Sequence, residues 1–111
     1  MEFYTVDDVE TNQSYQLPKE IIHNEKYKSL NANEKITYAI LKDMHLLSIK
    51  NNWIDENNYL YLMLTDHELG VILKLTSRTI NKIKNNLKEH GLIHMERQGL
   101  NKPNVIYLLK P

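Results

Sequence analysis

The chain of 111 residues contains no cysteine, and this absence excludes several kinds of chemistry. Without thiols there is no disulfide, no thiolate zinc site and no thiol nucleophile. Long apolar runs are also missing, because none approaches the ~18 residues of a membrane span, and the acidic start at residues 1–4 is unlike a signal peptide. We therefore expect a soluble, cytoplasmic protein without a membrane partner, folded around a core of its own.

Net charge is missing as well, since 14 basic residues balance 14 acidic ones. Neutrality by itself argues against nucleic acid as a partner. The two halves differ, however: residues 1–64 contain six lysines and ten acidic residues (net −4), and residues 65–111 contain eight basic and four acidic residues (net +4). From Lys74 to Lys88 there are five basic residues and no acidic one. Salt screens charges beyond about 8–10 Å, so this local excess decides what docks there.

The N-terminal 14 residues carry acidic side chains and little apolar periodicity. They predict an arm, residues 1–14, or an edge strand near residues 3–6. An arm this short cannot fold alone, so its apolar residues Phe3, Tyr4 and Val6 indicate docking on a partner subunit. The remaining residues, 15–111, are expected to form the folded domain.

Helical signals follow the arm. Pro18 favours a short helix, since proline is common in a first helical turn. Asn31 and Glu34 have the spacing of a capping box, and the apolar period after them predicts a helix to about residue 49. The apolar run at residues 59–64 predicts a strand.

The second half has the element order strand, helix, turn, helix, hairpin. Thr65 and Glu68 form another capping-box pattern. A further helix is expected over about residues 77–90, ending at Gly91. Two short strands around a turn rich in Gly, Asn and Pro predict a β-hairpin over residues 92–109.

Residues 65–87 have the spacing of a helix-turn-helix. Two helices that cross steeply need a small residue at their contact, and Gly70 stands there. Thr76 is the expected N-cap of the second helix. Lys74 occupies the turn position at which glycine often adopts a left-handed conformation. Buried apolar positions fall at the required intervals: Leu69, Leu73, Leu75, Ile80 and Ile83.

The second helix of this motif has a polar face that suits DNA. Arginine can recognise guanine and asparagine adenine in the major groove, while hydroxyls and lysines meet phosphates. Its first turn, Ser77, Arg78 and Thr79, also directs backbone N–H groups toward a phosphate. The predicted DNA-binding residues on this helix are Ser77, Arg78, Thr79, Asn81, Lys82, Lys84, Asn85 and Asn86, with Lys84 reaching outward from the flank of the apolar face.

The hairpin is expected to act as a wing beside this helix. Arg97, Gln98, Asn101 and Lys102 flank its turn. A basic hairpin tip of this kind can enter the adjacent minor groove or hold the backbone. The elements together predict an α+β fold, a winged helix-turn-helix with extra N-terminal helices and a β-hairpin wing.

Four stretches, residues 15–20, 30–35, 48–56 and 96–104, resemble the N-terminal domain of RepA-type initiators of plasmid replication in Gram-positive, staphylococcal-like bacteria. The resemblance spans residues 15–109, and the wing is its most specific part. It implies sequence-specific binding to repeated sites (iterons) of double-stranded DNA in a plasmid origin, as a homodimer. It also implies that replication machinery is recruited through a C-terminal domain that this chain lacks.

Other readings of the sequence remain open. The same motif serves winged-helix transcriptional regulators, and a winged helix can also be used only for protein–protein docking. No carboxylate has a paired base or nucleophile, so we expect no enzyme activity. His90 and His94 lie four residues apart, but Gly91 ends the helix between them, so we expect no metal and no cofactor.

Overall fold

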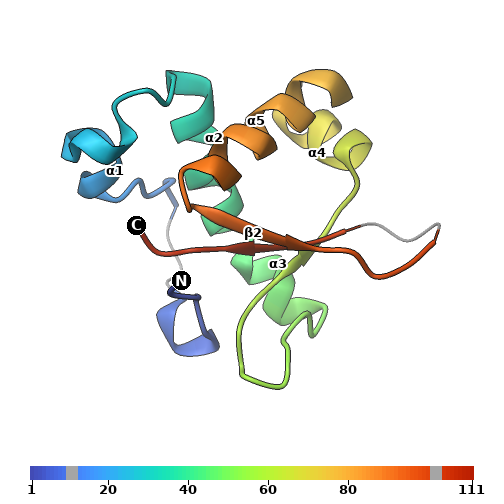
Figure 1. Cartoon of the computed structure of the whole chain (residues 1–111). Coiled ribbons are helices and arrows are strands. Elements are labelled where there is room, and N and C mark those ends of the chain that lie inside the picture. The colour runs from blue at the N-terminus through green and yellow to red at the C-terminus, as the bar shows by residue number, and fades with distance from the viewer. Residues whose placement is uncertain (10–12, 101–103) are drawn as a thin grey trace.

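The computed structural model describes residues 1–9, 13–100 and 104–111 of the chain. Helices cover one side of a small antiparallel sheet in which β3 is the central strand, in the order β1–β3–β2. Figure 1 shows the sheet below α2, α4 and α5, with the β2–β3 hairpin extending away from the body. The strands are β1 (Leu62–Met63), β2 (Ile93–Glu96) and β3 (Val105–Leu108).

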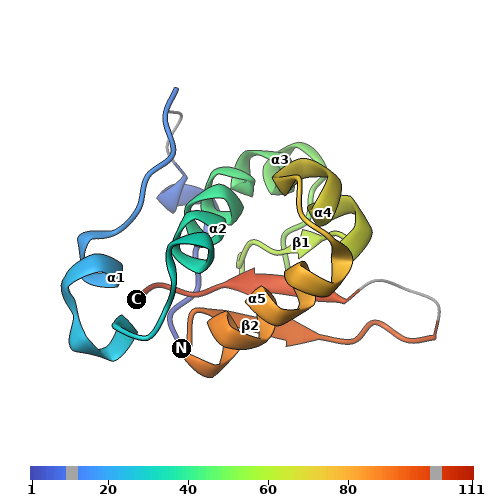
Figure 2. The ribbon, with the colours of Figure 1, turned by 90° about the horizontal axis from the view of Figure 1, so that it is seen from above.

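Five α-helices and two short 3₁₀ segments are present among the described residues. They are η1 (Val6–Asp8), α1 (Lys19–His23), η2 (Glu25–Tyr27), α2 (Ala32–Asp43), α3 (His45–Lys50), α4 (Asp66–Leu73) and α5 (Ser77–Glu89). In the view from above, α5 overlies β2, and α1 lies at the end opposite the hairpin (Figure 2). This mixed arrangement confirms the predicted fold class, including the extra N-terminal helices and the hairpin.

The predicted helix starts are confirmed by their capping contacts. The Asn31 side chain accepts from the Glu34 N–H at 2.8 Å, while the Glu34 carboxylate accepts from the Asn31 N–H at 2.9 Å. Thr65 and Glu68 make the same reciprocal pair, and Thr76 caps α5 through the Thr79 N–H. Each pair satisfies N–H groups that the first helical turn otherwise leaves without partners.

The helix predicted to run to residue 49 is wrong in one respect, because it is two helices. Met44 lies between α2 and α3 with φ −68° and ψ −4°, which breaks the helical path. The bend turns the next helix so that Ser48 donates to the Tyr61 carbonyl at 2.6 Å. The apolar spacing continues across the bend, and a periodicity argument therefore cannot detect it.

The strand predicted at residues 59–64 is shorter than expected. Only Leu62 and Met63 form ladder pairs with β3, and Tyr59 and Leu60 make isolated bridges. Asn58, with φ +67°, sits in the turn just before them, and the Asp55 side chain accepts from the Tyr59 N–H at 2.9 Å. The turn therefore uses hydrogen-bonding groups that a longer strand would need.

The N-terminal segment is not a free arm, so the expectation that Phe3, Tyr4 and Val6 dock on a partner subunit is wrong for Phe3 and Tyr4. Tyr4 belongs to the hydrophobic core. Phe3 pairs with Leu109 through an isolated bridge and stacks on Tyr59, with ring centroids 4.4 Å apart. The half-buried Val6 starts η1. These rings cover sheet residues of their own chain.

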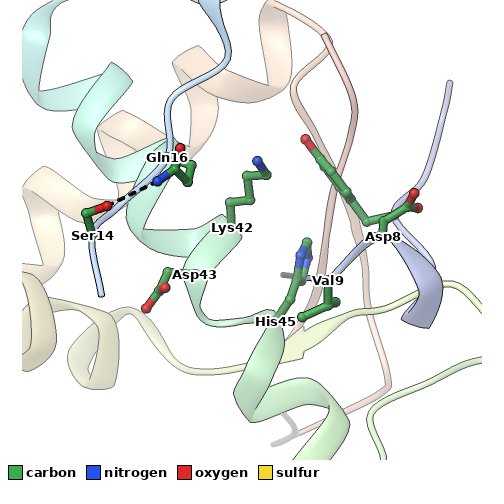
Figure 3. Close-up of a pocket in the computed structure, with 8 residues that line it drawn as sticks. Asp8, Val9, Ser14, Gln16, Lys42, Asp43 and His45 are labelled. Carbon is green, nitrogen blue, oxygen red and sulfur yellow. Dashed lines mark hydrogen bonds between the residues drawn. The ribbon is translucent and has the colours of Figure 1, made fainter. Parts of the chain in front are cut away.

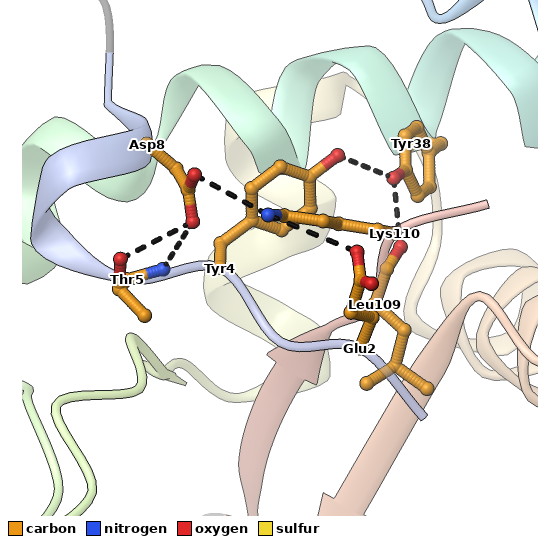
Figure 4. A network of polar contacts seen from close by, with 7 residues as sticks. All are labelled: Glu2, Tyr4, Thr5, Asp8, Tyr38, Leu109 and Lys110. Carbon is orange, nitrogen blue, oxygen red and sulfur yellow. Dashed lines mark hydrogen bonds and ion pairs between the residues drawn. The ribbon is translucent and has the colours of Figure 1, made fainter.

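A polar network joins the two ends of the chain (Figure 4). The Tyr38 hydroxyl donates to the Leu109 carbonyl at 2.8 Å and lies 2.9 Å from the Tyr4 hydroxyl. Lys110 lies 3.3 Å from an Asp8 carboxylate oxygen and 3.9 Å from one of Glu2. Burial raises the pKa of both tyrosines, so both stay neutral in this network. The termini are thereby fixed on the side of the molecule away from the hairpin.

The crossing of α4 and α5 depends on Gly70. A Cβ atom at this position would lie 2.5 Å from the Leu75 carbonyl oxygen, a backbone atom that cannot rotate away. Between the helices, Lys74 adopts the left-handed conformation (φ 58°, ψ 43°), as expected for the turn position that commonly holds glycine. The predicted helix-turn-helix geometry is thus present, with lysine accommodated in the strained position.

We expect Gly70→Ala to lower the free energy of unfolding by about 1–3 kcal/mol, because the methyl group forces the turn away from α4. Alanine favours helix over glycine, so a loss of stability isolates the steric effect. Urea unfolding followed by circular dichroism measures it. The exposed neighbour Val71 provides the control, since Val71→Ala should change stability by less than about 0.5 kcal/mol. Equal stability of the two variants would contradict this account of the crossing.

Candidate nucleic-acid interface

One face of α5 is fixed in the core. Ile80, Ile83 and Leu87 are 4% exposed or less, and the helix contacts α4, α2 and β2. Their spacing of three and four residues places them along one stripe of the helix. The opposite stripe is therefore held facing outward by an anchored helix.

The outward stripe forms an open groove whose lining side chains include no carboxylate. Arg78, Asn81, Lys82 and Asn85 are exposed on it. The Asn85 amide donates weakly to the Asn81 side chain at 3.3 Å, so both amides lie side by side on the surface. The residues that line the groove are Arg78, Thr79, Asn81, Lys82, Asn85 and Asn86. A guanidinium, amides and an ammonium are the groups that recognise base edges and phosphates.

The first turn of α5 is partly occupied by its own cap. The Thr76 hydroxyl donates to the Thr79 hydroxyl at 2.9 Å and accepts from the Thr79 N–H at 3.2 Å. Thr79 is half-buried, whereas Ser77 and Arg78 are exposed at the helix start. An N-terminus of this kind attracts anions through its N–H groups and dipole. Ser77 and Arg78 are the members of the turn best placed to meet one.

Lys84 does not reach outward, which corrects the prediction that it contacts DNA. It is 7% exposed, and its ammonium lies 2.5 Å from an Asp66 carboxylate oxygen at the start of α4. A buried ammonium needs a charged partner, and this pair provides one. Lys84 therefore joins the two helices of the motif and leaves the candidate interface.

Asn86 is half-buried and also binds a residue of α2. Its amide donates to the Glu34 carboxylate of α2, the same group that caps Asn31. Glu34 is 2% exposed, so its carboxylate depends on these donors. At the next turn, His90 binds the Asn86 carbonyl and the Ser29 hydroxyl at 2.7 and 2.8 Å. Asn86 thus lines the groove but mainly holds α5 in place.

The wing residues divide into two groups. Arg97 and Gln98 follow β2 and are exposed, in a hairpin that projects past the helices (Figures 1 and 2). Asn101 and Lys102 lie outside the described residues. The paired strands β2 and β3 place the exposed wing residues at a fixed distance from the body, because their register runs from Ile93–Leu108 to Glu96–Val105.

A second hollow lies beneath the N-terminal segment and has a volume of about 130 Å³ (Figure 3). His45 lies at its edge and is 2% exposed, and its Nε2 has no hydrogen-bond partner among residues 1–9, 13–100 and 104–111. Burial, aided by the charge of Lys42, lowers the pKa of His45 to about 4. The imidazole is therefore neutral near pH 7, where general-base catalysis needs a pKa close to neutrality. This histidine has the properties of a packing residue.

Two further classes of site have no support within the described residues. No cluster of three or more His, Asp or Glu side chains in that part of the chain could hold a metal ion. No helix among the described residues is long and apolar enough to cross a bilayer.

Comparison with known proteins places this geometry in a family. The model of the "Replication initiator protein A (RepA) N-terminus" family matches residues 13–110. The chain belongs to this family. A "41 kDa protein" of Lactobacillus helveticus is 30% identical over the whole chain. The chain spans only about a third of the length of that curated relative, 33%.

Solved structures of similar proteins share the fold. The "N-Terminal domain of DNA binding protein" is 41% identical, with a TM-score of 0.85 over 100% of this chain and 85% of that chain. The "Structure of Rep-DNA complex" is 42% identical, with a TM-score of 0.85 over 99% and 85% of the two chains. The "Structure of MDR initiator" is 44% identical, with a TM-score of 0.82 over 99% and 87%.

The sequence alone did not reveal which residues hold α5. In the sequence, Glu34 and Asp66 stand only in the first turns of predicted helices. In the structure, Glu34 accepts from the Asn86 amide and Asp66 accepts from the Lys84 ammonium, both on α5. The available signal was Lys84 itself, since a lysine beside the apolar stripe needs a carboxylate if it is buried. Which acidic residue meets it depends on the crossing angle of α4 and α5.

Removing one member of the Lys84–Asp66 pair tests this assignment. Asp66→Asn leaves a buried ammonium without its counter-charge and should lower the free energy of unfolding by about 3 kcal/mol. Lys84→Met removes the buried charge and should cost clearly less, while leaving any DNA affinity of the folded protein within about twofold. Urea unfolding and a binding titration measure the two effects. A large loss of affinity in folded Lys84→Met would restore Lys84 to the interface.

The low pKa of His45 predicts a pH-dependent stability. Well above pH 6.5, the ordinary pKa of histidine, His45 is neutral in both states and contributes nothing. As the pH falls from 6.5 to 5, His45 becomes protonated in the unfolded chain but stays neutral in the folded chain. The free energy of unfolding should therefore fall by roughly 1–2 kcal/mol. His45→Gln should make this decline shallower. A decline of unchanged steepness in that variant, measured by urea unfolding at each pH, would rule out His45 as its source.

Proposed function

We propose that this chain is the DNA-binding domain of a plasmid replication initiator and binds repeated sites of double-stranded DNA in the origin. The observation that carries the proposal is the outward face of α5, where Arg78, Asn81, Lys82 and Asn85 are exposed on a helix whose other face is anchored. The likeness to a Rep–DNA complex at 42% identity supports it.

In this proposal α5 enters the major groove. The groove is about 12 Å wide and admits one helix. Arg78 and Asn85 read base edges, Asn81 contributes a second amide, and Lys82 and Ser77 meet phosphates, while Thr79 stays engaged with the Thr76 cap. Asn86 lies at the edge of the contact with DNA, because its amide already donates to the Glu34 carboxylate. The activity is binding, without catalysis.

The wing is the second contact in this proposal. Arg97 and Gln98, with Asn101 and Lys102 in the sequence that follows, hold the backbone or enter the minor groove beside the α5 site. The two contacts on one side of the duplex fix its direction relative to the domain. Repeated sites would then be read in a set orientation.

We further propose that the domain binds as a homodimer. Two copies would meet two half-sites, and their spacing on the duplex would follow the distance between the two α5 helices. For proteins with the length of the Lactobacillus helveticus relative, recruitment of replication machinery would reside in the two thirds that this chain does not span.

Selection from a random duplex library tests the binding. The wild-type chain should enrich a defined sequence, and Arg78→Ala or Asn85→Ala should then relax discrimination at one base pair by about 1–3 kcal/mol. Fluorescence anisotropy against the selected duplex and its single-base variants measures this. Lys50→Ala, which removes an exposed charge at the end of α3, is the matched control and should retain full discrimination.

Two outcomes of that selection would overturn the proposal. Failure to enrich any sequence, with no binding at low salt, would indicate a winged helix that docks only on protein. Enrichment of a sequence that lies beside promoters but not in origin repeats would indicate a transcriptional regulator. Binding that does not weaken with added salt would exclude the phosphate contacts.

A further inference from the structure

The tip of the wing carries a leucine in contact with water. Leu100 is 91% exposed, the highest value among the large apolar side chains of the described residues. Gly99 precedes it with φ +128°, a backbone conformation that lets the chain turn at this point. Turn tips favour Gly, Pro, Asn, Asp and Ser, each for a reason of backbone geometry. Leu100 supplies none of these and touches no core, so the fold does not require it.

Polar and basic residues surround this leucine along the chain. Arg97 and Gln98 precede it and are exposed, and Lys102 follows it in the sequence. From residue 97 to residue 104 the sequence has two basic residues and no acidic one. The tip therefore combines one apolar side chain with a local positive charge.

We propose that Leu100 is an apolar contact residue that enters the minor groove of the DNA beside the site read by α5. This inference rests on the proposed function and adds a residue that the polar and basic pattern does not include. The minor groove is about 6 Å wide, so it admits a single side chain between its sugar walls. Leucine is among the apolar side chains that proteins insert there, where it displaces water and can part a base step.

DNA suits this tip better than a second protein surface. A stable protein interface buries about 800 Å² on each partner, and one leucine on a narrow hairpin supplies a small fraction of that. The sugar edges of the minor groove are apolar, while the phosphates along both walls are negative. In the sequence, Arg97 precedes Leu100 and Lys102 follows it, so the segment supplies positive charge for phosphates as well as an apolar side chain.

The test compares Leu100→Ala with wild type on the duplex that wild type selects from a random library. Losing the contact should weaken binding about tenfold, while the slope of affinity against salt stays unchanged because no charge is removed. Arg97→Ala should flatten that slope. Leu100→Met, which keeps an apolar side chain of similar size, should stay within about threefold of wild type.

Ile22→Ala is the matched control. Ile22 is an exposed apolar residue, 50%, on α1 at the end of the molecule opposite the wing (Figure 1). It should leave affinity unchanged. All variants should melt at the wild-type temperature, because each side chain is largely outside the core.

Footprinting separates the two grooves. Hydroxyl radicals report sugar accessibility in the minor groove, and dimethyl sulfate reports guanine N7 in the major groove. Leu100→Ala should lose protection of sugars beside the α5 site and retain protection of N7. Unchanged affinity and footprint, or a change in self-association in place of DNA binding, would overturn the inference. If the wild-type chain enriches no sequence, the proposed function itself is contradicted. This outcome is distinct from one in which wild type binds a selected duplex and Leu100→Ala binds it equally well.

Discussion

The close approach of α4 to the turn before α5, at Gly70, is the constraint on which the rest of the structure depends. A Cβ atom there would meet the Leu75 carbonyl oxygen at 2.5 Å, so only glycine lets the turn pass. The turn sets the direction in which α5 leaves, and Lys74 holds its left-handed step. That direction decides which stripe of α5 packs on α2 and β2 and which stripe faces outward. The candidate interface is therefore a consequence of one missing methyl group.

Three polar contacts then fix α5 along its length: Lys84 with Asp66, Asn86 with Glu34, and His90 with Ser29. They reach α4, α2 and the segment before α2. The Lys84–Asp66 and Asn86–Glu34 pairs are partly buried and add little net stability, since desolvation offsets much of the attraction, and the His90–Ser29 pair is exposed. A misplaced helix would break all three, so their effect falls on orientation and rotation. These contacts use Lys84 and Asn86, which lie beside the outward stripe of α5. The stripe therefore presents fewer side chains to a ligand than the polar face of the helix contains.

Local signals predicted much of this fold. Capping boxes at Asn31 and Thr65 and the cap at Thr76 depend on three or four consecutive residues, and each is present as expected. The bend at Met44 and the docking of Phe3 and Tyr4 depend on partners tens of residues away, which local spacing does not encode. The same limit applies to the interface. The polar face predicted from the sequence includes Arg78, Asn81, Lys82 and Asn85, which are exposed, but the inward position of Lys84 depends on the packing of α4.

The neutral net charge also becomes intelligible in three dimensions. Several charges of both halves are used inside the molecule: Lys84 meets Asp66, and Lys110 meets Asp8 and Glu2. Within the described residues, Arg78 and Lys82 take part in no ion pair, so the positive charge on the outward stripe of α5 is not cancelled by a neighbouring carboxylate. Oppositely charged groups that pair within the fold cancel over a few ångströms. A ligand therefore meets the charges that are not paired within the fold. The sign and position of this unpaired charge depend on which cations already bind a carboxylate of the same chain.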